Sequence, residues 1–335
     1  MPPPTPPPHT RRTFLKTTLV AGAALGLEWG CGTPQAAAPA QGRRLKLALI
    51  ADLHNDVMPD GPERLAAFLA AARAGQVDAV VQLGDFATPH PRNAALLAGW
   101  RGLDLPRHSV LGNHDTDGGF QRTAAAAAFG MPACHYSVVT NGVRLVFLDG
   151  NIPNPKVKGY ACSLGQEQLD WLDALLATDR LPVLVFVHQP PENCLHDGKQ
   201  LLDLLAKANQ AAGTARILAC VSGHLHQDSF RAPQGIPCVE INSASYYWVG
   251  GHTHRSMSEE IHKKCPSLAS TCPYEGPLWA VLTVDAAAGT LEIEGMQTRW
   301  VGPSPQDLKV KMTAQESALI TPKISARHWK AGQTT

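Results

Sequence analysis

The sequence predicts an α/β fold, because short apolar runs rich in valine, isoleucine and leucine alternate with longer stretches rich in alanine and leucine. The chain has 335 residues, of which 44% are hydrophobic and 17% are charged, so it is long enough to bury a large core. Its 29 lysine and arginine residues nearly balance its 28 acidic residues, and we therefore expect no basic surface for nucleic acid.

In the first part of the chain, most apolar runs are followed by a helical stretch. The predicted order is strand 45–51 (LKLALIA), helix 62–75, strand 79–83 (AVVQL), helix 92–101, strand 107–111 (RHSVL) and a helix near 120–129. A hairpin follows in HYSVVTNGVRLVFLD, because Asn141–Gly142 between two apolar runs favours a two-residue type I′ turn.

The α/β order returns after the hairpin and then gives way to strands. The predicted elements are helix 165–178, strand 183–187 (VLVFV), helix 198–211 and strand 216–221 (RILACV), followed by strands in CVEI, SYYWV, LWAVLTV and TLEIEG. No linker rich in Pro, Gly or Ser divides this region, so we expect one domain over residues 45–300. Large apolar residues are few beyond Gln306, and residues 306–335 are predicted to form a surface tail.

Residues 1–40 have the order of an export signal. The stretch TRRTFLK matches the twin-arginine pattern, and the apolar run TTLVAGAALGL that follows is too short to span a bilayer. Small residues at Ala38–Pro39–Ala40 suit a signal peptidase, so we expect cleavage after Ala40. This predicts export by the twin-arginine machinery to the periplasm or the medium, with no stable membrane span after cleavage.

Cleavage after Ala40 would remove Cys31 and leave seven cysteines, and an odd number cannot pair completely within the chain. Cys265 and Cys272 are close enough in sequence to form a short disulfide loop in an oxidising compartment.

Residues that can bind metal follow five of the predicted strands. The motifs are Asp52-x-His54, Gly84–Asp85, Asn113–His114–Asp115, His188 and His224-x-His226. Sites in α/β sheets form at the carboxyl ends of strands, and residues two apart in an extended segment share a face. We therefore expect Asp52 with His54, and His224 with His226, to face one cavity.

A second pair of histidines, His252-x-His254, lies 28 residues after the first pair. It follows an aromatic run and two glycines rather than a buried-type strand. We expect this pair to form a polar surface turn and not a metal site.

The ordered set of motifs resembles the calcineurin-like metallophosphoesterase family, whose pattern is D-x-H, GD, GNH[D/E], H and GH-x-H. The resemblance covers about residues 45–300 and implies a two-sheet sandwich flanked by helices in four layers. It also implies two metal ions: one held by Asp52, His54, Asp85 and His226, and the other by Asp85, Asn113, His188 and His224. Asp85 would bridge the two ions.

The resemblance implies hydrolysis of a phosphate ester. Two cations about 3.5–4 Å apart lower the pKa of a bridging water, so that hydroxide attacks phosphorus in line at neutral pH. His114 would stabilise or protonate the leaving oxygen, and Asp115 would hold the His114 ring in orientation. Nitrogen and oxygen ligands fit Mn, Fe or Zn without choosing among them.

The motif GDFATPH favours a phosphodiester over a phosphomonoester. Ser/Thr protein phosphatases of the family continue GD as GD-x-V-D-R-G, whereas Pro89 occupies the arginine position here, and Thr88 replaces the tyrosine of purple acid phosphatases. The branch with bacterial cyclic-nucleotide phosphodiesterases is more similar. The monoester alternative would need a distant cation such as Lys156 or Lys158.

Two further interpretations stay open: a non-catalytic metal-binding scaffold, and a periplasmic metal-delivery protein.

Other residues are candidates for the surroundings of the site. Asn55 and Asp56 directly follow the first motif. The aromatic residues Tyr246, Tyr247 and Trp248 either stack on a base or pack in the core.

Overall fold

Two six-stranded sheets pack face to face in the computed structural model, which describes residues 44–155 and 158–333. The predicted signal at residues 1–40 lies outside the described residues. The first sheet has the order β16 (Arg327–Lys330), β13 (Thr290–Ile293), β12 (Ala280–Asp285), β1 (Leu45–Ile50), β2 (Ala79–Gln82) and β3 (Arg107–Ser109). The second has the order β4 (Tyr136–Thr140), β5 (Val143–Phe147), β6 (Val183–Phe186), β7 (Ile217–Ser222), β9 (Cys238–Glu240) and β8 (Ser229–Arg231).

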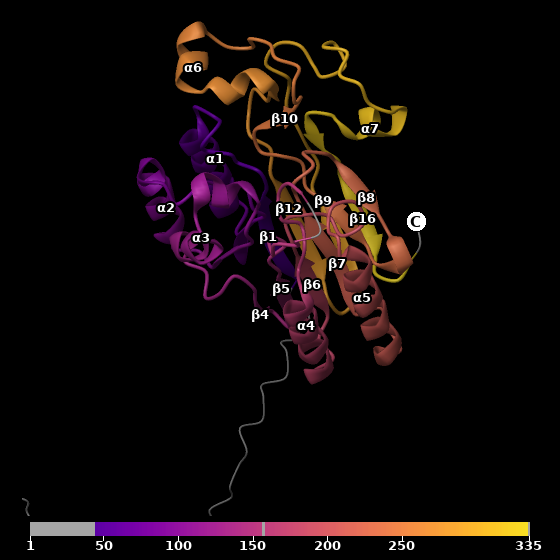
Figure 1. Cartoon of the computed structure of the whole chain (residues 1–335). Coiled ribbons are helices and arrows are strands. Elements are labelled where there is room, and N and C mark those ends of the chain that lie inside the picture. Colours follow the sequence, from indigo (N-terminus) through magenta and orange to yellow (C-terminus); the bar gives the residue numbers. More distant parts are fainter. Residues whose placement is uncertain (1–43, 156–157, 334–335) are drawn as a thin grey trace, which may run out of the picture. The chain divides into compact units, whose positions relative to one another are not determined.

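Helices cover the outer face of each sheet, so the predicted four-layer sandwich is confirmed (Figure 1). The first sheet is covered by α1 (Gly61–Ala74), α2 (Ala94–Arg101) and α3 (Arg122–Phe129), and the second by α4 (Gln166–Thr178) and α5 (Gly198–Ala212). The core between the sheets contains side chains such as Leu47, Phe186 and Leu282, because apolar residues of these strands point inward. No helix within residues 44–155 and 158–333 is long and apolar enough to cross a membrane.

The parallel strands decide where the motifs lie. β1, β2 and β3 run parallel in the first sheet, as β5, β6, β7 and β9 do in the second. Their carboxyl ends therefore lie at a common edge of each sheet, and the polar residues that follow them are brought together.

The predicted hairpin is confirmed. Thr140 pairs with Val143 across the turn, and both turn residues have positive φ, 49° at Asn141 and 77° at Gly142. This conformation matches the right-handed twist of the flanking strands.

The predicted surface tail at 306–335 is wrong. α7 (Ala314–Leu319) begins with a capping box between Thr313 and Glu316, and β15 (Lys323–Ile324) pairs with β14 (Met296–Gln297). β16 then pairs with β13 as the edge of the first sheet, with Trp329 only 5% exposed. A strand of four residues with one large apolar side chain is too short for a periodicity signal.

Residues 246–273, which we term the cap, contain two short strands with helical turns between them. β10 (Tyr246–Trp248) pairs with β11 (Thr271–Pro273), and α6 (Glu259–Lys264) and the 3₁₀ turn η4 (Pro266–Ser270) lie between (Figure 1). The remaining 3₁₀ turns are η1 (Pro91–Asn93), η2 (His114–Gly119) and η3 (Pro233–Gly235). The seven cysteines of the described residues are all free, so the loop between Cys265 and Cys272 is not closed.

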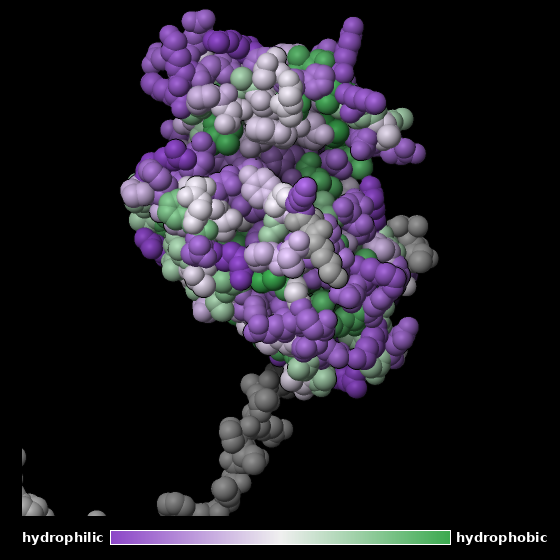
Figure 2. All heavy atoms as spheres, viewed as in Figure 1, coloured by the Kyte–Doolittle hydropathy of each residue, from purple (hydrophilic) through white to green (hydrophobic). Residues whose placement is uncertain are grey.

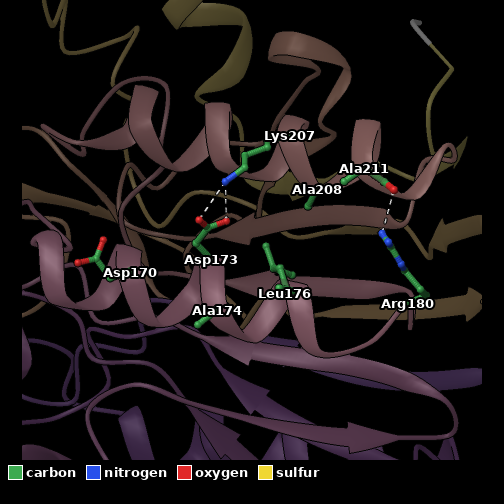
Figure 3. Close-up of a pocket in the computed structure, with 9 residues that line it drawn as sticks. Asp170, Asp173, Ala174, Leu176, Arg180, Lys207, Ala208 and Ala211 are labelled. Carbon is green, nitrogen blue, oxygen red and sulfur yellow. Dashed lines mark hydrogen bonds and ion pairs between the residues drawn. The ribbon is translucent and has the colours of Figure 1, made fainter.

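The face of the molecule seen in Figure 2 is largely polar, with hydrophobic residues scattered among hydrophilic ones. A surface groove of about 500 Å³ lies between α4 and α5. Lys207 pairs there with Asp173 at 3.0 Å, and Arg180 donates to the carbonyl of Ala211 (Figure 3). These contacts join the two helices, and none of the predicted site residues lies in this groove.

Candidate metal centre

Loops from both sheets meet at the carboxyl ends of the parallel strands and form two groups of possible metal ligands. Within each group the ligand atoms lie within 4.8 Å of one another, and the groups are Asp52, His54 and His226, and Asp85, His188 and His224. Six of the seven predicted ligands are thus brought together, and His224 and His226 fall in different groups.

Asp85 lies between the two groups. Its Oδ2 is 3.1 Å from Nε2 of His188 in its own group and 3.7 Å from Nε2 of His54 in the other. In the first group, Nε2 of His226 is 3.1 Å from Nε2 of His54 and 3.3 Å from Oδ1 of Asp52. Asp85 therefore lies where one carboxylate could contact ions held by both groups.

Asn113, the seventh predicted ligand, lies beside the second group. The backbone N–H of the next residue, His114, donates to Oδ1 of Asp85 at 2.8 Å. Oδ1 of Asn113 is buried and has no hydrogen-bond partner among the described residues. An unpaired buried amide oxygen is costly, and a cation would satisfy it. Together with four imidazoles and two carboxylates, this oxygen makes a donor set that fits two transition-metal ions.

Backbone carbonyl groups orient two of the imidazoles. Nδ1 of His188 lies 2.7 Å from the carbonyl oxygen of Leu83, and Nδ1 of His226 lies 2.6 Å from that of Tyr246. In each ring Nδ1 therefore donates, and Nε2 is the nitrogen left to bind a metal.

Burial and charge set the protonation of the site. Burial lowers the pKa of His54 to about 3 and that of His224 to about 4, which keeps both rings in the neutral form that binds metal. Burial also disfavours the charged forms of Asp85 and His188. Their mutual attraction outweighs this effect, so the pKa of Asp85 falls well below its usual range and that of His188 rises to about 10. Metal binding to His188 therefore releases a proton.

Five of the seven predicted metal ligands have left-handed backbone conformations, with φ of 52° at Asp52, 48° at His54, 50° at Asp85, 79° at His224 and 54° at His226. The sequence predicted that Asp52 with His54, and His224 with His226, face one cavity because each segment would be extended. The segments are not extended, so this reason is wrong. The side chains converge because the chain turns at each ligand. A residue with a side chain pays about 1–2 kcal/mol for this conformation, so other contacts must hold the loops.

Buried side chains supply those contacts. Asp115 accepts backbone N–H groups from Asp85, Phe86, Ala87 and Gly112 at 2.7–3.1 Å. Sequence reasoning missed two other anchors. Glu240 accepts the N–H of Leu225 between the two histidines, and Ser243 donates to the carbonyl of Asp52. The only sequence signal for Glu240 is a carboxylate at the end of an apolar run.

The expected contact between Asp115 and the His114 ring is absent from the described structure, because the Asp115 carboxylate is turned toward the backbone of the Gly84–Asp85 loop. Nδ1 of His114 instead lies 2.6 Å from Oδ2 of Asp117. Burial lowers the pKa of His114, but the hydrogen bond to Asp117 and the charge of Asp85 raise it overall. The hydroxyl of Tyr160 also donates to Asp117, at 3.1 Å.

A cavity of about 310 Å³ opens over both groups. Its lining consists of His54, Asp85, His114, Asp117, His224 and His226 from the site, and Val57, Leu225, Tyr246, Tyr247, Trp248 and Ser267. Tyr246 is buried, with its ring centroid 5.0 Å from those of His54 and His226, whereas Trp248 is 47% exposed at the rim. The cap therefore forms one wall of the cavity.

Other residues singled out from the sequence have structural contacts. Asp56 accepts from the backbone N–H of Thr88 and pairs with Arg92 at 2.6 Å, and Asn55 donates to Asn93. They join the loops that follow β1 and β2. In the second histidine pair, His252 is exposed and Nε2 of His254 lies 2.6 Å from the carbonyl oxygen of Thr271. Neither histidine belongs to a metal-ligand group found among the described residues.

The chain is similar to known phosphoesterases. The profile of the calcineurin-like phosphoesterase family matches residues 45–228, which include all five motifs. A probable cyclic nucleotide phosphodiesterase of Synechococcus is 29% identical over 202 residues, covering 55% of this chain and 74% of the relative. A second, from Psychrobacter, is 27% identical over 128 residues, covering 37% of this chain but only 36% of the relative.

Among solved structures, a dimetal phosphatase from Danio rerio has a similar fold, with a TM-score of 0.54 and 16% identity. The similarity covers 77% of this chain and 98% of that chain. The matched motifs, the two groups of metal ligands and the four-layer fold lead to one conclusion: the chain is a hydrolase of ester bonds that belongs to the calcineurin-like phosphoesterase family.

Proposed function

We propose that the protein hydrolyses a phosphodiester, in particular a cyclic nucleotide or another nucleotide derivative. The observation that carries this proposal is the charge of the cavity, because its described lining contains no lysine or arginine. A phosphomonoester dianion is commonly held by an arginine fork, whereas a diester carries one negative charge fewer. The names of the two curated relatives support the same substrate class.

The cations considered from the sequence do not supply the missing fork. Arg92 is bound to Asp56, and Lys158 is exposed and lies outside the cavity lining. Lys156, the other cation considered from the sequence, lies outside the described residues.

Each side chain of the site has a role in this reaction. Asp52, His54 and His226 would hold one ion, and Asn113, His188 and His224 the other, with Asp85 shared between them. The ions, whether Mn, Fe or Zn, would supply an activated water and neutralise the phosphoryl oxygens. His114 projects into the cavity beside Asp85 and would donate a proton to the leaving oxygen.

The test is kcat/KM of the metal-loaded protein for bis(p-nitrophenyl) phosphate against p-nitrophenyl phosphate. We expect a clear preference for the diester. A strong preference for the monoester would support the alternative, a phosphomonoesterase acting on a small phosphorylated metabolite. Stable metal binding without turnover of either substrate would favour a non-catalytic scaffold or a metal-delivery protein.

We also propose export by the twin-arginine route, on the basis of TRRTFLK and the short apolar run after it. This route carries folded proteins, so metal would be loaded in the cytosol, where a weaker-binding ion such as Mn²⁺ can be chosen over Zn²⁺. Arg11→Lys with Arg12→Lys should leave the precursor in the cytoplasm. The matched control, Arg43→Lys with Arg44→Lys, lies after the expected cleavage point and should be exported. Normal export of the first variant would contradict the proposal.

A further inference from the structure

We propose that Asp117 and Tyr160 are positioning residues for His114, and that they allow the enzyme to cleave esters with poor leaving groups. This inference rests on the proposed function, in which His114 donates a proton to the leaving oxygen. It differs from the family resemblance, which implied that Asp115 orients the ring.

Three contacts join these residues into one unit. Oδ2 of Asp117 lies 2.6 Å from Nδ1 of His114, and the Tyr160 hydroxyl donates to Oδ1 of Asp117 at 3.1 Å. The ring centroids of Tyr160 and His114 are 4.9 Å apart, inclined at 57°. Asp117 therefore holds the Nδ1 side of the ring, while Tyr160 holds both the carboxylate and the ring face. Nε2 is the nitrogen left to meet a substrate.

The backbone alone does not orient the ring. The N–H of His114 is bound to Oδ1 of Asp85, which fixes the position of the residue but does not set the rotation of its side chain. The carboxylate of the neighbouring Asp115 accepts hydrogen bonds from backbone N–H groups and so does not contact the ring. The 3₁₀ turn is broken at Asp117, with ψ of 149°, and Gly118 follows with φ of 77°, a conformation that glycine adopts without strain.

The two residues contribute little to packing. The side chain of Asp117 is 44% exposed, and Tyr160 is 52% exposed. Side chains that are this exposed usually contribute little to the free energy of unfolding. Substitutions of Asp117 or Tyr160 should therefore leave the fold intact. Their contacts with one another and with His114 are therefore better explained by the reaction than by stability.

The chemical step makes the role concrete. A water forms the new bond to phosphorus and loses one proton, and the bond from phosphorus to the leaving oxygen breaks with its electron pair on that oxygen. The proton on Nε2 of His114 goes to the same oxygen. A nitrophenolate is a weak base and leaves without this proton. The alkoxide of a sugar hydroxyl is a strong base and needs the proton in order to leave, so correct placement of Nε2 matters most for alkyl esters.

The experiment measures how kcat depends on the leaving group. The substrates are aryl methyl phosphodiesters of decreasing phenol acidity, with a 3′,5′-cyclic nucleotide as the alkyl ester. For Asp117→Ala we expect a loss of about threefold with p-nitrophenolate and about a hundredfold with the alkoxide, within the range of general acid catalysis. Tyr160→Phe keeps the ring contact and removes the hydroxyl, so its loss should follow the same trend but be smaller.

Asp170→Asn, an exposed change on α4, is the matched control and should behave as the wild type. Metal content measured by elemental analysis should be unchanged in all three variants. An equal loss with every leaving group, or loss of metal from Asp117→Ala, would overturn the positioning role. Absence of phosphodiester turnover by the wild type would instead overturn the proposed function.

Discussion

The floor and the rim of the cavity are built differently. On the floor, Asp52, His54, Asp85, His188 and His226 are each no more than 5% exposed, and their loops are held by backbone hydrogen bonds to buried side chains. On the rim, Trp248 is about half exposed. Tyr160, which is also about half exposed, contacts the lining residues His114 and Asp117, and these side-chain contacts hold the three residues that we term the rim group.

This difference separates two requirements of the enzyme. The floor must resist the backbone strain of its four left-handed ligands and the repulsion of two cations, so it needs buried anchors. In the proposed function the rim would meet the variable part of the substrate, and exposed contacts of this kind can change without unfolding the protein. Substitutions on the floor should therefore affect metal binding and stability, and those on the rim should affect substrate preference.

The largest effect is expected for Asp85→Asn. The amide keeps the shape but loses the charge shared by both groups, so both ions should be bound more weakly. Losing several kcal/mol of charge stabilisation corresponds to a fall in kcat/KM of about a thousandfold. Elemental analysis and steady-state kinetics test this, with Asp173→Asn on α4 as the exposed control. Full metal content and activity in the variant would show that Asp85 does not bridge.

Asp115→Ala should give the next largest effect, on stability. Four backbone N–H groups lose their acceptor in a buried loop, and at roughly 1 kcal/mol for each the free energy of unfolding should fall by about 4 kcal/mol. Urea unfolding measures the change, and Asp203→Ala on the exposed face of α5 serves as control. A fall of less than about 1 kcal/mol would mean that the loop does not depend on this anchor.

Trp248→Ala should have the smallest effect and change only substrate binding. If the indole stacks on a base, KM for a nucleotide diester should rise up to about tenfold, while KM for a small dialkyl diester stays the same. Stability should change by no more than about 0.5 kcal/mol, because the side chain is 47% exposed. The same rise in KM for both substrates would argue against stacking.

The sequence predicted the residues of the floor more completely than the contacts of the rim. A polar residue directly after a buried strand is visible in the sequence, so Asp52, Asp85 and His224 were placed at strand ends. Their left-handed conformations were not predicted. Two ligands separated by a single residue give the same sequence pattern whether the segment is an extended strand or a turn. The partner of His114 was misassigned because the family resemblance implied Asp115, whereas the turn geometry places Asp117 against the ring.

Contacts between distant loops leave no periodic signal. Tyr160 reaches His114 across 46 positions of sequence, and β16 joins the first sheet with one buried tryptophan. Such contacts depend on the path of the chain in three dimensions, which local patterns of hydrophobicity do not encode.

The first sheet also constrains the order of events during protein synthesis. β1, which carries the first two ligands at its end, pairs on one side with β12, where Leu45 lies opposite Val284. The ribosome therefore makes β1 long before its antiparallel neighbour exists, and the nascent sheet keeps an open edge until the last quarter of the chain has emerged. The first sheet can therefore be completed only after β12 has left the ribosome, and on the proposed twin-arginine route, which carries folded proteins, transport would follow that step.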